Sequence, residues 1–232
     1  MTPARRRLYL MRHAQVRYFE GQQPELVQLT EAGRRQAEAA AAALAGVRFD
    51  RVVTSGLART EETARIVAPG VEHEPLRGLR EVESGDLRGV APETVQQMMS
   101  TAFRGLVPRE TEFLGGETIG SLLDRVLSTV DGLLSDESWD VLLLVLHGAV
   151  NRAILSRAIT GQDVFLGGFE QSPGCINVLD VDAHGSWIVR AVNHTPYDPV
   201  HVHAPRATTM EQLWEEYLAS RPARGRSPRA SG

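Results

Sequence analysis

Three short runs of apolar and β-branched residues predict buried strands. They lie at residues 8–11, 51–54 and 141–146. The third run, Val-Leu-Leu-Leu-Val-Leu, is apolar at every position, as in a central parallel strand that is covered on both faces. We therefore expect it to occupy the middle of a sheet.

Helical patterns follow these predicted strands. Thr30 can cap a helix over residues 31–44, and Gly46 supplies its end. A second helix is predicted over 57–67, before Pro69, and a third over 150–159, closed by Gly161. Residues 92–138 also look helical, with a glycine-rich break at 114–116. The alternation predicts an α/β fold of three layers, with a mostly parallel central sheet flanked by helices.

The last third of the chain adds a hairpin and a helix. Residues 175–181 and 187–192 alternate between apolar and polar positions around an Asp-Ala-His-Gly turn. Leu213, Trp214 and Tyr217 indicate a final amphipathic helix that docks on the body. We expect one domain over residues 1–219 and a disordered, Arg-rich tail over 220–232. A basic interaction arm is the alternative for the tail.

Composition excludes several classes of protein. All 25 basic residues are Arg, so a Schiff-base lysine and the lysine of a P-loop are both ruled out. A single cysteine, Cys175, excludes an intrachain disulfide and a multi-cysteine metal site. The net charge of −4, with four arginines in the tail, leaves an acidic body that does not suit nucleic acid. No apolar run approaches the ~18 residues of a membrane helix, so we expect a soluble cytoplasmic protein.

Arg and His residues follow all three predicted strands. Arg12 and His13 come directly after the first, Arg59 lies shortly after the second, and His147 and Gly148 follow the third. The carboxyl ends of parallel strands share one edge of a sheet, where helix N-termini also point. Arginine matches phosphate oxygens, and a neutral imidazole can attack phosphorus. The pattern predicts a phosphate site, although a lone histidine after a strand is more often structural.

These residues sit in segments that resemble the motifs of the histidine phosphatase superfamily, which includes the cofactor-dependent phosphoglycerate mutases. The resemblance runs from about residue 8 to 160 and is carried by residues 8–14, 29–37, 54–64, 79–89 and 146–152, with a looser match at 116–118. It implies a phosphoglycerate mutase-like fold.

The resemblance also implies roles for individual residues. His13 would be the nucleophile that becomes a phosphohistidine. Arg12, Arg59, His147 and Gly148 would bind the phosphoryl oxygens, and Glu81 would donate a proton to the leaving oxygen. Glu83 is the alternative acid. No metal or cofactor is implied, because arginine and His147 supply the electrostatic stabilisation.

The function expected is a metal-independent phosphomonoester hydrolase that acts on a small phosphorylated metabolite, with no nucleic-acid or membrane partner. A phosphoglycerate mutase is the first alternative, although only 65 residues separate Glu81 from His147, which is typical of the phosphatase branch. A non-catalytic module that binds a phosphorylated ligand is the second. The identity of the substrate stays open, as does the oligomeric state, for which a homodimer is one option.

Two features fall outside this picture. The opening motif departs from the family pattern at Ala14, Gln15 and Phe19, where a glycine, an acid and an asparagine are usual. These changes alter one wall of the expected pocket. Separately, His194, Asp198, His201 and His203 could ligate a metal, since the spacing of His201 and His203 puts both on one face of a strand, but polar edge residues near the mouth of the site are the simpler interpretation.

Overall fold

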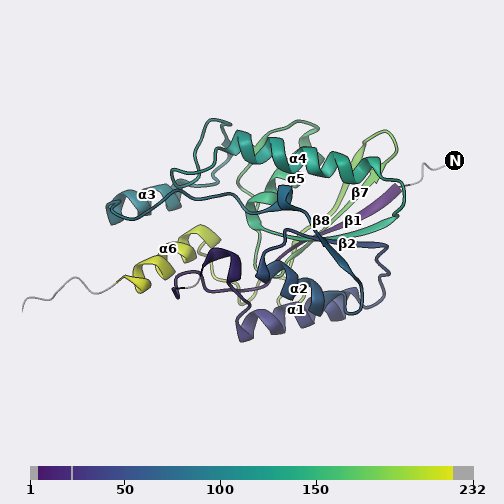
Figure 1. The fold of residues 1–232 in the computed structure, drawn as a ribbon, viewed down its shortest axis with the longest axis horizontal. Helices are drawn as coiled ribbons and strands as arrows, with labels where there is room; N and C mark the ends of the chain where they lie inside the picture. Colours follow the sequence, from purple (N-terminus) through teal and green to yellow (C-terminus); the bar gives the residue numbers. More distant parts are fainter. Residues whose placement is uncertain (1–4, 22, 222–232) are drawn as a thin grey trace, which may run out of the picture.

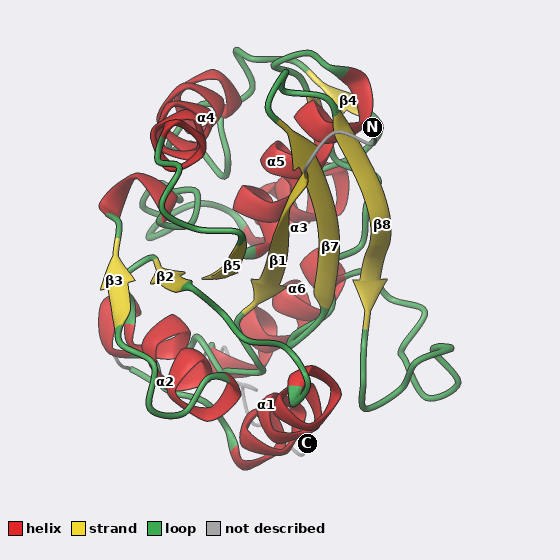
Figure 2. Cartoon of the chain, turned by 90° about the vertical axis from the view of Figure 1, so that its right-hand side faces the viewer, coloured by secondary structure: helices red, strands yellow, loops and turns green. Residues whose placement is uncertain are grey.

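A six-stranded sheet lies at the centre of the computed structural model, which describes residues 5–21 and 23–221. The strand order is β3 (His73–Pro75), β2 (Arg51–Thr54), β5 (Val141–Leu146), β1 (Arg5–Arg12), β7 (Ile176–Asp182) and β8 (Trp187–His194). The first four strands are parallel, and β7 and β8 form the predicted antiparallel hairpin beside β1. The apolar strand β5 occupies an interior position between β1 and β2, as its sequence predicts (Figure 2).

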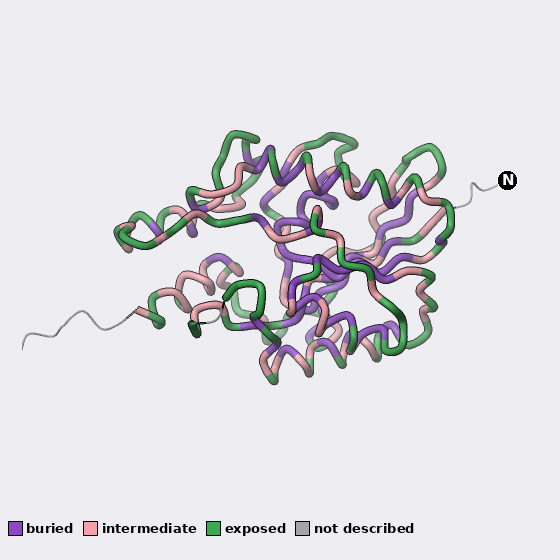
Figure 3. The backbone as a smooth tube through the Cα atoms, in the orientation of Figure 1, coloured by how far each residue is buried: buried purple, intermediate pink, exposed green. Residues whose placement is uncertain are grey.

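Helices cover both faces of this sheet. α1 (Glu31–Leu44) and α2 (Ala58–Val67) lie on one side, and α4 (Ile119–Ser135) and α5 (Gly148–Thr160) lie on the other (Figure 1). Each pair of helices contributes to a separate apolar cluster against the strands. Buried residues accordingly concentrate along the sheet and on the helix faces turned toward it (Figure 3). The predicted three-layer α/β fold is confirmed.

Two helices lie outside the layers. α3 (Pro92–Thr101) and α6 (Thr209–Ser220) sit beyond the carboxyl end of β1 and pack on each other through Val95, Met99 and Met210 (Figure 1). A small two-stranded sheet joins β4 (Leu106–Val107) to β6 (Phe165–Leu166), and short 3-10 turns η1 (Pro24–Leu26) and η2 (Arg77–Leu79) complete the described chain. Within this part of the chain, no helix is both long and apolar enough to cross a membrane.

One predicted segment is wrong. Residues 92–138 do not form a single helical stretch with a three-residue break, because α3 ends at Thr101 and α4 begins only at Ile119. The intervening chain contains Gly105, Pro108 and two consecutive glycines, which favour turns over helix. The tail prediction falls on residues 222–232 for the most part and lies outside the described residues.

The N-terminus of α1 passes directly against the loop that follows β1. Thr30 caps the helix by accepting a hydrogen bond from the N–H of Gly33 at 3.0 Å. A Cβ atom on Gly33 would lie 2.2 Å from the carbonyl oxygen of Gln15, and backbone cannot yield as a flexible side chain can. Glycine at this position therefore lets α1 hold the loop that carries the first histidine.

We predict that Gly33→Ala destabilises the protein by about 1–3 kcal/mol, because the added methyl group forces α1 away from the loop. Gly132→Ala is the matched control, since Gly132 also lies inside a helix but has nothing within 4 Å of the added Cβ. It should be neutral or stabilising by about 0.4–1 kcal/mol. Urea denaturation measures both, and equal effects would contradict the close approach at Gly33.

Candidate active site

The carboxyl ends of β1, β2 and β5 bring the predicted arginine and histidine residues to one edge of the sheet. The strand ends are level, with Arg12 opposite Leu146 and Thr54 opposite Val145. The imidazole rings of His13 and His147 lie edge to face with their centroids 5.3 Å apart. Both rings are buried, at 1% and 0% exposure. The sequence thus predicted this gathering correctly.

Hydrogen bonds fix the tautomer of His13. Its Nδ1 lies 2.8 Å from the carbonyl oxygen of Ala14, which can only accept, so Nδ1 carries the hydrogen. Nε2 therefore bears the lone pair. The hydroxyl of Tyr18 lies 3.2 Å from Nε2 and donates to it. Tyr18 was not identified from the sequence, because only the course of the loop after His13 brings it back to the ring.

His147 is held by a chain of hydroxyl groups. Its Nε2 lies 2.7 Å from Ser55 Oγ, which in turn lies 3.0 Å from Thr60 Oγ1. Thr60 donates its hydrogen to the Leu57 carbonyl, so Ser55 donates to Thr60 and accepts from His147 Nε2. Nδ1 of His147 is buried without a partner among the described residues. When the ring is protonated, Nδ1 becomes a donor that no described group uses.

Two arginine side chains bring positive charge to the site, of which Arg59 is buried and Arg12 is half-buried. Arg12 donates from Nη1 to the Gln171 carbonyl at 2.5 Å, and Arg59 donates to the Pro24 carbonyl at 2.9 Å. Nε of each is buried and unpaired, and neither arginine has a carboxylate partner within the part of the chain that the structure describes. Such groups attract an anion.

Burial and these arginines keep both histidines neutral. Desolvation lowers the pKa of His13 well below its usual range, and the charges of Arg59 and Arg12 lower it further. The pKa of His147 is lowered in the same way, first by desolvation and then by Arg59, His13 and Arg12. His13 thus keeps its lone pair available at neutral pH.

Glu81 lies at the N-terminus of α5. Its Oε1 accepts hydrogen bonds from the N–H groups of Val82 at 3.0 Å and Ala149 at 3.2 Å. A Cβ on Gly148 would lie 3.8 Å from Glu81 Oε2, 3.9 Å from Arg12 Nε and 3.1 Å from Arg152 Nη1, so these groups converge where glycine leaves room. Glu83, by contrast, is exposed. The geometry favours Glu81 over Glu83 as the acid.

A cavity of about 640 Å³ opens over these groups. It is lined by five of the residues that the sequence assigns to the site, Arg12, His13, Arg59, Glu81 and Gly148, and also by the alternative acid Glu83. His147 does not line it, since its buried ring stands beside that of His13. Arg80 and Arg152 line it as well, and the sequence analysis assigned them no role, although they lie in the same motifs as Glu81 and His147.

The three departures from the family motif have clear structural places. Ala14 is fully buried and donates its N–H to Thr63 Oγ1 at 3.2 Å. Gln15 accepts from the Thr30 hydroxyl at 2.8 Å. Phe19 lines the cavity and packs edge to face on Tyr217 of α6, with ring centroids 5.5 Å apart.

The strand that the metal alternative needs does not form. His201 and His203 lie in a loop between β8 and α6, and the carboxylate of Asp198 accepts the N–H groups of Val202 and His203 at 2.8 and 2.9 Å. Across residues 5–21 and 23–221, no group of three or more His, Cys, Asp or Glu side chains could hold a metal ion.

Comparison with known proteins identifies a family. The model of the histidine phosphatase superfamily (branch 1) matches residues 8–195. A probable 2-carboxy-D-arabinitol-1-phosphatase of Arabidopsis thaliana is 29% identical over 208 residues, which are 84% of this chain but 43% of that protein. The chain thus spans less than half the length of this relative. An adenosylcobalamin/alpha-ribazole phosphatase of Salmonella typhimurium is 29% identical over 75% of this chain and 90% of its own length.

Solved structures agree with this match. The native structure of a mycobacterial glucosyl-3-phosphoglycerate phosphatase superposes with a TM-score of 0.66 and 27% identity. The alignment covers 82% of this chain and 99% of that one.

We predict that His13 and His147 stay neutral at pH 6, where a histidine of ordinary pKa near 6.5 is mostly protonated. Because the folded rings bind fewer protons than the unfolded chain, the free energy of unfolding should fall as the pH drops below about 6.5. Correlation spectra of the imidazole ¹⁵N nuclei report the charge directly. A protonated ring at either position in the ligand-free protein at pH 6 would show that burial does not control the site.

Proposed function

Because the chain belongs to the histidine phosphatase superfamily, we propose that it is a metal-independent phosphomonoester hydrolase that forms a phosphohistidine at His13. The observation that carries the proposal is the hydrogen bond from His13 Nδ1 to the Ala14 carbonyl, which leaves the lone pair on Nε2. The substrate is a small phosphorylated metabolite. Support comes from the phosphatase names of the relatives and from the buried, unpaired Nε atoms of Arg12 and Arg59.

In the first step, Nε2 of His13 attacks phosphorus. The nitrogen–phosphorus bond forms as the bond from phosphorus to the substrate oxygen breaks. Glu81 in its acid form transfers a proton to that leaving oxygen, so an alcohol departs. Tyr18 must turn its hydroxyl away from Nε2 before attack, because its hydrogen bond occupies the same lone pair.

In the second step, water attacks the phosphohistidine. The Glu81 carboxylate accepts a proton from the water, and the nitrogen–phosphorus bond breaks with its electron pair returning to Nε2. Inorganic phosphate leaves, and Glu81 is again in its acid form. The resting state of both residues is thereby restored.

Arginine side chains carry the charge that develops on the phosphoryl oxygens. Arg12 and Arg59 each have an unpaired Nε, and a bound phosphate dianion would also favour protonation of His147 and donation from its Nδ1. Each such donor typically contributes roughly 10²–10³ in rate. The groups are already in place, so little reorganisation accompanies the reaction.

Two alternatives make different predictions. A phosphoglycerate mutase must shield its phosphohistidine from water until an acceptor arrives, whereas a cavity of about 640 Å³ leaves room for water beside a phosphoryl group. A non-catalytic binding module requires the arginines but neither a nucleophile with a fixed tautomer nor an acid. The fixed tautomer of His13 and the place of Glu81 beside Gly148 support hydrolysis.

We expect rapid acid-free quenching of the enzyme with labelled substrate to trap phosphate that is stable to base and labile to acid. His13→Ala should abolish both the trapped species and turnover, because His13 lines the cavity whereas His147 does not. The assay is run with EDTA, which should leave the rate unchanged. Wild-type turnover without a phosphoenzyme would contradict the covalent mechanism. Transfer of the phosphoryl group to phosphoglycerate in preference to water would favour a mutase.

Glu81→Gln is predicted to slow the hydrolysis of alkyl phosphates by roughly 10²–10⁴-fold, since an alkoxide needs a proton to leave. p-Nitrophenyl phosphate should lose much less, because its leaving group is a stable anion. Steady-state kinetics on both esters make the comparison, with the exposed Glu83→Gln as the control that changes neither. Equal losses on the two esters would make Glu81 a positioning residue, and a selective loss in the Glu83 variant would move the acid.

A further inference from the structure

The cavity extends well beyond the groups that would hold a phosphoryl group. Its volume of about 640 Å³ falls in the range that encloses ligands of drug size. A phosphoryl group has only a few heavy atoms and fills a small part of it. The remainder must accommodate the rest of the substrate.

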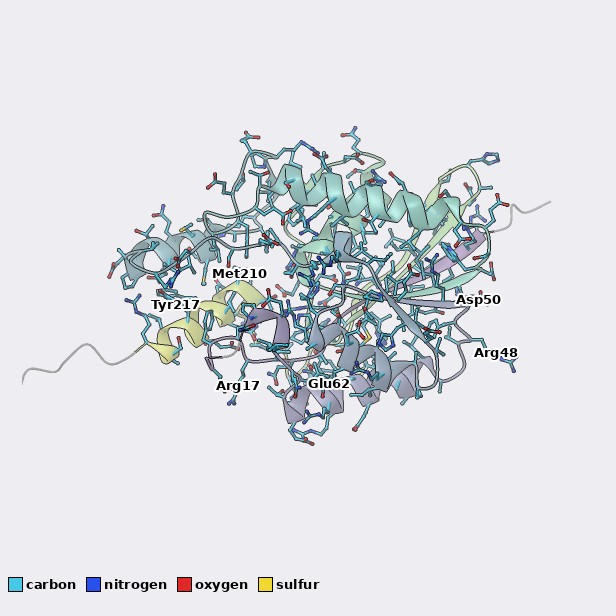
Figure 4. All side chains as sticks on the ribbon, in the orientation of Figure 1. Arg17, Arg48, Asp50, Glu62, Met210 and Tyr217 are labelled. Atoms are coloured by element: carbon cyan, nitrogen blue, oxygen red, sulfur yellow. The ribbon has the colours of Figure 1, made fainter. Side chains whose placement is uncertain are left out.

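The outer part of the cavity, which we call the outer chamber, is walled by apolar side chains. They come from α3, α6 and the loops that face them, and they are Leu87, Met99, Phe113, Leu114, Met210 and Leu213. Met210 lies on the first turn of α6, as Figure 4 labels it, and it contributes to the cluster that joins α6 to α3. Apolar atoms that face a concave cavity, rather than being scattered over a convex surface, indicate contact with a ligand.

Aromatic residues continue this wall toward the phosphoryl end. Phe103 and Phe113 stack with centroids 5.2 Å apart and planes 3° from parallel. Phe103 and Leu114 both adopt positive φ, at 59° and 51°, which costs free energy for residues other than glycine. Such conformations persist where the surrounding packing imposes them, so the wall is held in a defined shape.

The charges near the outer chamber disfavour a second anionic group on the substrate. The Arg152 guanidinium lies over the Phe103 ring, donates to the Gly167 carbonyl and approaches Glu170 at 4.0 Å, and its Nη1 lies beside Gly148 at the phosphoryl end. Carboxylates of Glu25, Glu83 and Glu216 also line the cavity. Arg80 also lines the cavity, and its Nε, like those of Arg12 and Arg59, is buried without a partner among the described residues, so we assign it to the phosphoryl group.

We propose that the outer chamber binds an uncharged, apolar substituent of the substrate, aromatic or alkyl, while the arginines hold the phosphoryl group. The proposal rests on the proposed function and names the class of its substrate: phosphomonoesters of apolar alcohols rather than of hydroxy acids. Continuity of the chamber with the phosphoryl end favours substrate as its occupant. Residues 222–232 contain no large apolar side chain, so their composition does not suit this wall.

Binding of phosphonates tests the proposal, because they carry no bond that the enzyme can hydrolyse. The three probes are butylphosphonate, 4-phenylbutylphosphonate and 4-carboxybutylphosphonate, and calorimetry gives Kd. The phenyl compound should bind roughly 10- to 100-fold more tightly than the butyl compound, through the added apolar burial. The carboxyl compound should gain nothing. Equal affinities, or tightest binding of the carboxyl compound, would overturn the proposal.

Variants of the outer chamber test whether its side chains cause the tighter binding of the phenyl compound. Leu213→Asn on α6 and Leu87→Asn in the 82–91 loop should each remove at least fivefold of the affinity for the phenyl compound and leave that for butylphosphonate unchanged. Leu218→Asn is the matched control, since Leu218 lies on α6 but is 45% exposed and does not line the cavity. Thermal melting verifies that each variant is folded. If Leu213→Asn does not fold, Leu87→Asn still tests the proposal.

Three further outcomes separate the role of the outer chamber from the proposed function. Retained preference for the phenyl compound with no hydrolysis of any ester would count against the proposed function and support the chamber. A dimer that dissociates when the phenyl compound binds would assign the chamber to a second copy of the chain and overturn the proposal. If the phenyl compound still bound more tightly than butylphosphonate in both Leu213→Asn and Leu87→Asn, the proposal would also be overturned.

Discussion

Unpaired positive charge at the carboxyl edge of the sheet is the constraint on which the site depends. Arg12 and Arg59 are held by backbone carbonyls instead of carboxylates, and their Nε atoms are buried without partners among the described residues. The fold tolerates this arrangement because the two neighbouring histidines stay neutral. Burial and the arginines together lower both histidine pKa values. A phosphate dianion would relieve the imbalance, and under the proposed function the electrostatics that keep His13 neutral would also bind the phosphoryl group.

Much of this site could be predicted because it depends on strand ends. Arg12, His13 and His147 follow strands whose apolar pattern is strong, and parallel strands place their carboxyl ends at one edge. Tyr18 could not be found in this way, because its contact with His13 depends on the path of an irregular loop. The position of His147 beside the cavity instead of on its surface also depends on side-chain packing. Ser55 could have been identified, since it follows a strand and a hydroxyl there is within reach of the third strand end.

The packing of α3 on α6 could not be predicted from the sequence, for a different reason. Both helices are amphipathic, but each could have packed on the sheet like the four layer helices. The contact between Met99 and Met210 joins segments over a hundred residues apart, and no local pattern encodes that choice. Phe19 illustrates this dependence on tertiary packing. In the sequence it only replaces the asparagine usual in the family motif, whereas in the structure its ring packs on Tyr217 of α6. Of the three departures, Phe19 thus contacts α6, the helix that also supplies Met210 and Leu213 to the outer chamber.

In the proposed mechanism the phosphoryl group is transferred twice, first to His13 and then to water. The stereochemical course at phosphorus tests it most directly, using an isotopically chiral thiophosphate monoester hydrolysed in labelled water. Each in-line displacement inverts the configuration, so two displacements predict overall retention in the inorganic thiophosphate released. Overall inversion would show that water attacks the substrate directly, and His13 would then bind the phosphoryl group without ever carrying it.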